Sequence, residues 1–143
     1  MIWDRWLLFL QRNSMFNPKK QTIMEAKKKY FMDCHLAGRM YHEADEVWDK
    51  LKVGTMVQLV REDDNRYDPN AVMVCYNDEE QDEQVCLGYI PRAHNNVIAL
   101  MMDMGYANIF ECCINQVNEK AHPEQQVNLT IKIRRNIEKK DKN

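Results

Sequence analysis

The sequence predicts a mainly β protein, a small and partly closed antiparallel barrel of the OB-like or SH3-like type, with about six strands and one or two short helices. Short apolar runs bounded by turn residues recur along the chain. Only one stretch shows a long helical periodicity. Strands and helices do not alternate in the β-α-β rhythm of a parallel sheet. Barrels of this class often hold single-stranded nucleic acid on an open face.

The first half of the chain supplies three of the expected strands. Residues 30–38 mix aromatic and aliphatic side chains and stop at a glycine, while 55–61 and 71–76 show the alternation of half-buried strands. Between them, 43–54 has apolar residues at helical spacing, which predicts one or two helical turns that pack Trp48 on the barrel. The acidic side chains of this segment are expected to face solvent: Glu43, Asp45, Glu46 and Asp49.

The second half supplies the remaining strands. Residues 77–83 read as an exposed acidic loop, and 84–90 as a strand with Gly88 inside it, where a glycine marks a bulge or the close approach of another backbone. Residues 106–117 and 127–133 complete the sheet, and the second of these has the cleanest alternation in the chain.

Pro91 is expected to open the main helix, which Gly105 ends. Its spacing predicts an apolar stripe packed as core filler. The stripe consists of Ala93, Val97, Leu100, Met101 and Met104.

Three segments are expected along the chain. Residues 1–29 form an appendage, either a docking helix or a disordered arm, with Met24 as an alternative start. Residues 30–137 form the barrel domain. Residues 138–143 form a basic tail that frays.

Composition limits the possible functions. A net charge of −2 argues against a sequence-blind polyanion binder, so any nucleic-acid site is expected to be small and local. Five cysteines occur without a C-x-x-C pair, and Cys112 and Cys113 in a strand would point to opposite faces, so we expect free thiols and neither metal nor cofactor. Free thiols indicate a reducing compartment, the cytoplasm. No apolar run is long enough to span a membrane.

The stretch 61–74 reads REDDNRYDPNAVMV and predicts a hairpin with a decorated loop. Asp and Asn bond their own backbone in turns, and Pro69 fixes φ, so the connection should be rigid. It would present an aromatic ring, an acceptor and two guanidinium groups: Tyr67, Asp68, Arg61 and Arg66. By itself the stretch favours a simpler interpretation, a polar loop above a packed tyrosine, because turn residues cluster in every β protein.

Three segments together resemble the HIRAN domain, which occurs at the N-terminus of the helicase-like transcription factor and as small stand-alone bacterial proteins. They read LAGRMYHEA, LKVGTMVQLVREDDNRYDPNAVMV and LGYIPRAHNNVIALMMDMG, and the resemblance covers roughly residues 30–135. Its most specific signals are R-E-x-x-N-x-Y-D-x-N-A and then G-Y-[IL]-P-R followed by a helix.

The resemblance implies a non-catalytic module that binds single-stranded DNA and captures a free 3′ end in a pocket, in DNA repair or replication-fork processing. Tyr41 and Tyr67 would stack bases, and Asp68 would bond the terminal 3′-hydroxyl. Arg92 would hold a phosphate, and Tyr89 would line the pocket where the eukaryotic relative has a histidine. A helicase or other ATPase acting in trans is an implied partner.

The physical chemistry agrees with this implication. Stacking is worth about 1–3 kcal/mol per base, so two tyrosines could supply affinity on a nearly neutral protein. Arg61, Arg66 and Arg92 could neutralise two or three phosphates, which predicts a moderate salt dependence.

Two positions depart from the family pattern. His42 follows Tyr41 where a second tyrosine is common, and Met40 stands where the eukaryotic relative has a phosphate-binding arginine. Arg39 would face the other side of an extended strand, so the departure weakens phosphate contact and 3′-end capture.

Structural interpretations and a second function stand beside these expectations. Tyr41 could cover the barrel, Asp68 could close an Asx turn, and Arg61 could pair with the acidic loop. The alternative function is a protein-interaction adaptor that binds a peptide along an open edge. Arginines converging on the tyrosines would favour nucleic acid, and an apolar groove without arginines would favour a peptide. An enzyme is not expected, since the chain has no Walker loop, G-x-S-x-G or H-E-x-x-H motif.

Overall fold

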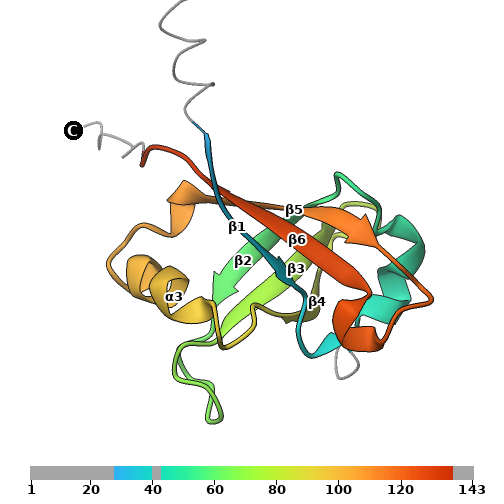
Figure 1. Cartoon of the computed structure of the whole chain (residues 1–143), viewed down its shortest axis with the longest axis horizontal. Helices are drawn as coiled ribbons and strands as arrows, with labels where there is room; N and C mark the ends of the chain where they lie inside the picture. Colours follow the sequence, from blue (N-terminus) through green and yellow to red (C-terminus); the bar gives the residue numbers. More distant parts are fainter. Residues whose placement is uncertain (1–27, 40–42, 137–143) are drawn as a thin grey trace, which may run out of the picture.

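The computed structural model describes residues 28–39 and 43–136, and it confirms the predicted mainly β class. Six strands form one antiparallel sheet in the order β1-β6-β5-β2-β3-β4 (Figure 1). The strands are β1 (Lys29–His35), β2 (Met56–Arg61), β3 (Val72–Asp78), β4 (Glu83–Tyr89), β5 (Phe110–Val117) and β6 (Val127–Ile133). The helices are η2 (Glu43–Lys50), α3 (Asn95–Asp103), η3 (Ala107–Ile109) and η4 (Pro123–Gln125). The predicted appendage (apart from residues 28 and 29), the basic tail and Tyr41 lie outside the described residues.

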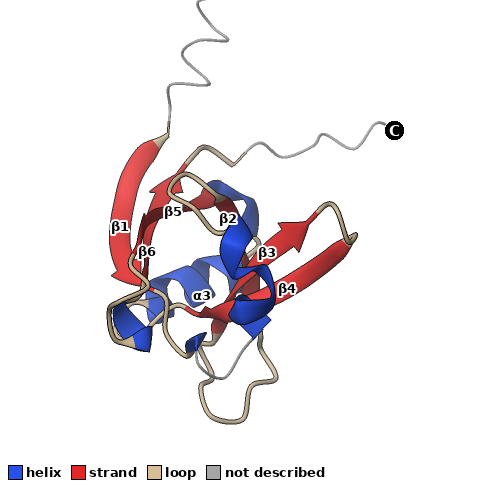
Figure 2. Ribbon diagram, turned by 90° about the vertical axis from the view of Figure 1, so that its right-hand side faces the viewer, coloured by secondary structure: helices blue, strands red, loops and turns tan. Residues whose placement is uncertain are grey.

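The two edges of the sheet meet at one point just after β1. The N–H groups of Ala37 and Tyr89 each donate to the other residue's carbonyl oxygen, at 2.9 and 2.8 Å, which links the chain beyond β1 to the end of β4. Gly88 allows this approach, because a Cβ there would collide with the carbonyl oxygen of Ala37. Both features expected of a glycine in this strand are present, since the β3–β4 register also shifts between Val74 and Cys75. The sheet therefore curves into a partly closed barrel (Figure 2).

The core fills the inside of this curved sheet. Alternate residues of β6 are buried, as its sequence pattern predicted. The largest fully buried apolar side chains come from strands, from the segments that follow β1 and β4, and from α3: Leu36, Val72, Val74, Leu87, Ile90, Ile98, Ile114, Val127, Leu129 and Ile131. Because these side chains pack together, α3 and the segments that follow β1 and β4 are held against the sheet.

The segment 43–50 packs Trp48 against the core, as predicted, and exposes its four acidic side chains. The expectation that residues 77–83 form a fully exposed acidic loop is wrong at Asp78, which is the last residue of β3 and is 4% exposed. Lys50 Nζ lies 2.9 Å from its Oδ2, and this hydrogen bond holds the pKa of Asp78 below its ordinary value. Burial is tolerated because the carboxylate has a charged partner from η2.

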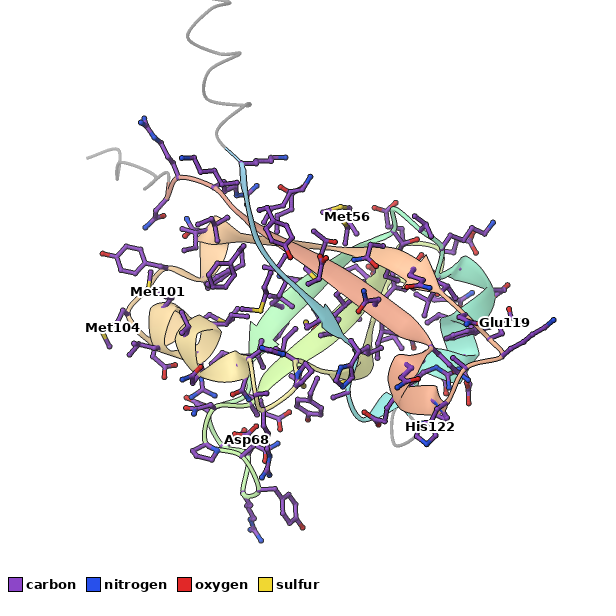
Figure 3. All side chains as sticks on the ribbon, viewed as in Figure 1. Met56, Asp68, Met101, Met104, Glu119 and His122 are labelled. Carbon is purple, nitrogen blue, oxygen red and sulfur yellow. The ribbon has the colours of Figure 1, made fainter. Side chains whose placement is uncertain are left out.

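The predicted start and the predicted buried face of the main helix are both wrong, whereas the helix ends just before Gly105, as expected. Residues 91–94 form a turn, with the N–H of His94 bonded to the carbonyl of Pro91, and α3 begins at Asn95. The buried face consists of Asn95, Ile98, Ala99 and Met102, whereas Val97, Leu100 and Met104 of the predicted stripe are exposed. Both faces of the helix are apolar, so periodicity alone could not choose between them. Figure 3 shows Met101 and Met104 on the outer side of α3.

The start of β5 differs from the prediction, whereas the placement of its two cysteines agrees with it. β5 starts at Phe110, because Ala107–Ile109 form a turn of 3₁₀ helix at the start of the predicted strand. Cys112 is buried and Cys113 half-buried on neighbouring positions of β5, which fits side chains on opposite faces. All five cysteines are present as thiols.

Candidate nucleic-acid interface

The loop between β2 and β3 is held in shape by its own side chains. The side-chain oxygen of Asn65 accepts hydrogen bonds from the N–H groups of Tyr67 (2.8 Å) and Asp68 (2.9 Å). Oδ1 of Asp68 accepts from the N–H of Asn70 at 2.9 Å, so the Asx turn considered from the sequence is present. The loop projects from the body of the molecule (Figures 1 and 3). Its Tyr67 side chain is 84% exposed. The hydrogen-bonded loop thus presents the aromatic ring of Tyr67 to solvent.

Arg61 stabilises this loop through hydrogen bonds to its backbone carbonyl groups. Its guanidinium donates to the carbonyl oxygens of Glu62 (3.2 Å), Pro69 (2.7 Å) and Ala71 (2.9 Å). It also forms two hydrogen bonds with the carboxylate of Asp103 on α3, at 2.9 and 3.2 Å. These five bonds match the five N–H donors of a guanidinium. Arg61 therefore ties the loop to α3, and its acidic partner is Asp103 and not the acidic loop.

A hollow of about 220 Å³ lies between this loop, the end of β4 and the segment after β1. Four of the predicted site residues come together around it, namely Tyr67, Asp68, Tyr89 and Arg92. Arg61 and Arg66 do not line it. The complete lining is Ala37, Gly38, Asn65, Tyr67, Asp68, Ala71, Tyr89, Ile90 and Arg92. Residues distant in the sequence thus form one concave surface, which we call the loop hollow.

One wall of the loop hollow carries a fixed carboxylate beside a reachable cation. Oδ2 of Asp68 accepts a hydrogen bond from Nδ2 of Asn95 at 2.8 Å, and Asn95 is 2% exposed at the start of α3. Nε of Arg92 lies 3.7 Å from the same oxygen. Arg92 also donates to the carbonyl oxygen of Tyr67, while its side chain remains 69% exposed. Asp68 is thereby oriented by the protein, and Arg92 stays accessible to a ligand.

The opposite wall is built on Tyr89. Its hydroxyl hydrogen-bonds to the carboxylate of Glu62, with O–O distances of 3.0 and 2.9 Å, and Nδ2 of Asn65 donates to the same carboxylate at 2.6 Å. Burial, together with this bond to Glu62, raises the pKa of Tyr89 to about 12. The tyrosine ring is therefore neutral and held in place as a pocket wall, which agrees with the lining position implied by the family resemblance.

Arg39 follows Gly38 of the loop hollow, and it stands next to the position where the eukaryotic relative has a phosphate-binding arginine. The guanidinium of Arg39 lies 4.1 Å from the ring centre of Trp48 and 2.6 Å from a carboxylate oxygen of Asp45. Arg39 is thus engaged with η2 and does not line the loop hollow. Residues 40–42 lie outside the described part of the chain, so the stacking role of Tyr41 stays a prediction.

Three residues that shape the site were not predicted: Glu62, Asn65 and Asn95. The first two stand in the quoted loop motif, where they looked like ordinary turn residues. Asn95 carried a detectable signal, because an asparagine among apolar residues of a helix that packs on a core needs a buried partner. That partner is Asp68.

The described residues contain no group of three or more His, Cys, Asp or Glu side chains placed to hold a metal ion. Among the helices of the same residues, none is long and apolar enough to cross a membrane.

Comparison with known proteins gives one family and three relatives. The family model for the HIRAN domain matches residues 29–135. A protein of Lactobacillus plantarum with a crystal structure is 26% identical, superposes with a TM-score of 0.61, and the match covers 74% of this chain and 94% of that one. The crystal structure of the HIRAN domain of human HLTF matches at a TM-score of 0.47 with 18% identity, over 77% of this chain and 83% of that one.

A rice protein (Oryza sativa subsp. japonica) named Fanconi-associated nuclease 1 homolog is 29% identical over 106 residues, which are 74% of this chain and 10% of that protein. The chain therefore spans about a tenth of the length of this curated relative. The family model covers the whole of the six-stranded sheet, including both halves of the loop hollow. The chain belongs to the HIRAN domain family.

Proposed function

We propose that this HIRAN domain is a non-catalytic module that binds single-stranded DNA and receives a free 3′ end in the loop hollow. The observation that carries the proposal is the combination of groups around one concavity: an exposed ring, an oriented carboxylate and an accessible guanidinium, from Tyr67, Asp68 and Arg92. Aromatic platforms next to cationic groups are the usual means of binding single strands without reading their sequence.

Tyr67 supplies the stacking surface in this proposal. A tyrosine ring that is 84% exposed on a loop fixed by Asn65 offers a flat apolar face whose position is set before the ligand arrives. Stacking one base on such a ring contributes about 1–3 kcal/mol. Because the mount is rigid, little of this free energy is lost to ordering the loop.

Asp68 supplies the preference for a strand end. An ionised carboxylate only accepts hydrogen bonds, so it can bind a terminal hydroxyl but repels a terminal phosphate. One of its oxygens is already oriented by Asn95, and the side chain is 17% exposed at the edge of the hollow. The Asp68 carboxylate can therefore accept a hydrogen bond from a terminal hydroxyl. The same carboxylate would repel a terminal phosphate, because both groups are negatively charged.

The cationic part of the site is small. Arg92 is the one arginine of the three predicted for phosphate binding that lines the loop hollow, whereas Arg66 is exposed on the same loop outside it. Arg61 is engaged with Asp103. One or two neutralised phosphates predict a shallow salt dependence, with a slope of about −0.7 for each phosphate of a single strand.

Fluorescence anisotropy with a labelled oligonucleotide tests the proposal. The strand with a 3′-hydroxyl should bind more tightly than the same strand with a 3′-phosphate. Tyr67→Ala should weaken both, while Tyr30→Ala, which removes an exposed tyrosine from β1, should not. Equal binding of both strands would reduce the function to general single-strand binding, and no binding at low salt would overturn the nucleic-acid function.

Partners of the module follow from its relatives and its surface. The rice relative carries the name of a nuclease and is about ten times longer than the matching segment, so we propose a DNA-processing enzyme, such as a helicase or nuclease in trans, as the working partner. The adaptor function is the second candidate, and one observation favours it: Val97, Leu100 and Met104 form an exposed apolar stripe on α3, away from the loop hollow. Binding of a protein partner that Leu100→Glu abolishes and Tyr67→Ala preserves would support it.

A further inference from the structure

Two cysteines lie directly opposite each other in the β3–β4 hairpin. Cys75 of β3 and Cys86 of β4 are register partners in the antiparallel pair. Opposite residues of an antiparallel pair project to the same face with their Cα atoms about 4.5–5.5 Å apart. A disulfide needs a Cα separation of about 4.4–6.8 Å. The two distance ranges overlap, and the two thiols, which share a hydrogen bond, lie opposite each other where the β3–β4 register shifts.

The two thiols differ in access and in acidity. Cys75 is 2% exposed, whereas Cys86 is half-buried and its Sγ lies 3.8 Å from the carbonyl oxygen of Gly88. A hydrogen bond between the two thiols, with burial, raises the pKa of Cys75, and the same hydrogen bond lowers the pKa of Cys86. The more accessible sulfur is thus also the better thiolate, which is the arrangement of a reactive cysteine next to a resolving one.

The other three cysteines lack this arrangement. Burial raises the pKa of the Cys34 thiol to about 11 and keeps Cys112 protonated as well. Cys113 is half-buried, but its register partners are Met56 and Thr130. Cys113 is therefore a matched control, with comparable exposure and no thiol opposite.

The thiol pair adjoins a wall of the loop hollow. Cys86 stands three residues before Tyr89, and the carboxylate of Glu62, which holds the Tyr89 hydroxyl, acts electrostatically on both thiols. Gly88, whose carbonyl the Cys86 thiol contacts, packs against Ala37 of the hollow. A chemical change at Cys86 can therefore shift the backbone next to the hollow and change the electrostatic potential at its Tyr89 wall.

We infer that Cys75 and Cys86 are a reversible oxidative modification site, converted by a peroxide into a cross-strand disulfide that tunes the neighbouring loop hollow. The Cys86 thiolate attacks one oxygen of the peroxide, the O–O bond breaks, and Cys86 becomes a sulfenic acid while the other oxygen leaves as hydroxide. Cys75 then attacks the Cys86 sulfur, the S–O bond breaks, and the proton of Cys75 leaves with the oxygen as water. A dithiol reductant reverses the reaction by thiol–disulfide exchange.

The tuning part of this inference rests on the proposed function. Oxidation replaces the Cys86 thiol, whose pKa is lowered, with a neutral disulfide that cannot ionise beside Glu62 and Tyr89. A DNA strand is an anion, so the oxidised domain should bind it more tightly, by about two- to threefold at low salt and less at high salt.

Mass spectrometry of the intact chain after mild hydrogen peroxide treatment tests the disulfide without reference to any ligand. The wild-type protein should lose the mass of two hydrogen atoms, proteolysis should yield a peptide pair joining Cys75 to Cys86, and dithiothreitol should restore the original mass. Cys113→Ser should behave as wild type, and Cys86→Ser should not form the bridge. Absence of the bridge in the wild-type protein, or a bridge between other cysteines, would overturn the assignment.

Anisotropy of the same oxidised and reduced samples then tests the tuning. Tighter binding by the oxidised wild type, with no oxidation effect in Cys86→Ser, supports it. A bridge that leaves the affinity of a binding-competent domain unchanged, or lowers it, would overturn the tuning. If neither form binds DNA, the proposed function and the tuning that rests on it both fail, whereas the mass spectrum still decides the modification site.

Discussion

Asp78 and Asp68 are two aspartates at the two ends of β3, and each lies near a cation: Asp78 is the last residue of the strand, and Asp68 stands in the loop before it. Asp78 is 4% exposed, its carboxylate accepts a hydrogen bond from Lys50 at 2.9 Å, and its other oxygen accepts one from the N–H of Glu80. Asp68 is more open, its nearest arginine nitrogen is 3.7 Å away on Arg92, and a neutral amide orients it. The first carboxylate is fully satisfied by the protein, and the second is oriented but keeps room for a further donor.

The difference teaches how one residue type can support stability at one end of a strand and, in the proposed function, binding at the other. At Asp78 the charge is neutralised by a lysine from η2, which joins η2 to the sheet. At Asp68 the cation is itself 69% exposed, so both members of the pair can exchange their mutual contact for contacts with a ligand. The two sites both have an acidic residue, and they differ in the exposure of the partner cation.

Loss of the aromatic platform should give the largest effect on binding. Tyr67→Ala removes the stacking surface and should weaken single-stranded DNA binding about 5- to 150-fold. The melting temperature should stay unchanged, since the side chain is 84% exposed. Anisotropy and thermal denaturation of the same preparation measure both quantities, and Tyr30→Ala serves as control. Loss of binding in both tyrosine variants would remove the special role of the loop.

Removal of the Asp68 charge should act on end selection. Asp68→Asn keeps an acceptor for the turn but replaces a charge-assisted hydrogen bond, worth about 1.5–3 kcal/mol, with a neutral one about half as strong, so binding of the 3′-hydroxyl strand should fall by up to about tenfold. Binding of the 3′-phosphate strand should rise or stay constant, because like-charge repulsion disappears. A variant that weakens both strands equally would assign Asp68 to the turn alone.

Two arginines should separate in their salt dependence. Arg92→Ala should lower affinity by up to about fivefold and make the slope of log K against log salt about 0.7 shallower, because one phosphate contact is lost. Arg61→Ala should lower affinity through a loosened loop while the slope stays the same. Titrations at four salt concentrations decide this, and a changed slope for Arg61→Ala would return Arg61 to the phosphate contacts.

Neutralisation of Asp78 should give the smallest effect on binding and a clear effect on stability. Asp78→Asn should lower the urea midpoint at pH 7 and leave DNA affinity unchanged, with exposed Glu79→Gln as control. The pKa of Asp78 is lowered in the folded state, so its contribution is present above the unfolded value of about 3.9 and is lost as the pH falls through the lowered folded value. The wild-type advantage should therefore vanish in acid. An advantage that persists there would contradict the ion pair as its source.

Local patterns predicted the sheet well, because strand alternation is a local property. The alternation in β6, the glycine in β4 and the Asx turn at Asp68 each depend on a few neighbouring residues. The family resemblance placed four side chains that the structure brings around the loop hollow. The alternation, the strand glycine and the Asx turn could be predicted because residues close in the sequence determine them.

Features set by partners distant in the sequence were not predictable. The inward face of α3 depends on Asn95 reaching Asp68, which is 27 positions earlier. The burial of Asp78 depends on Lys50, 28 positions earlier. The bracing role of Arg61 depends on Asp103, 42 positions later. In each case a polar pair across the fold decides what periodicity and composition leave open.

Photo-cross-linking tests the central claim, that the loop hollow receives the strand end, most directly. An oligonucleotide with 5-iodouracil at its 3′ terminus is irradiated with the wild-type domain, and the adduct is located by mass spectrometry of the digested protein. The account predicts an adduct on the peptide that carries Tyr67, and its loss in Tyr67→Ala. Adducts confined to α3 or to the basic residues beyond β6, with none at the loop, would contradict it.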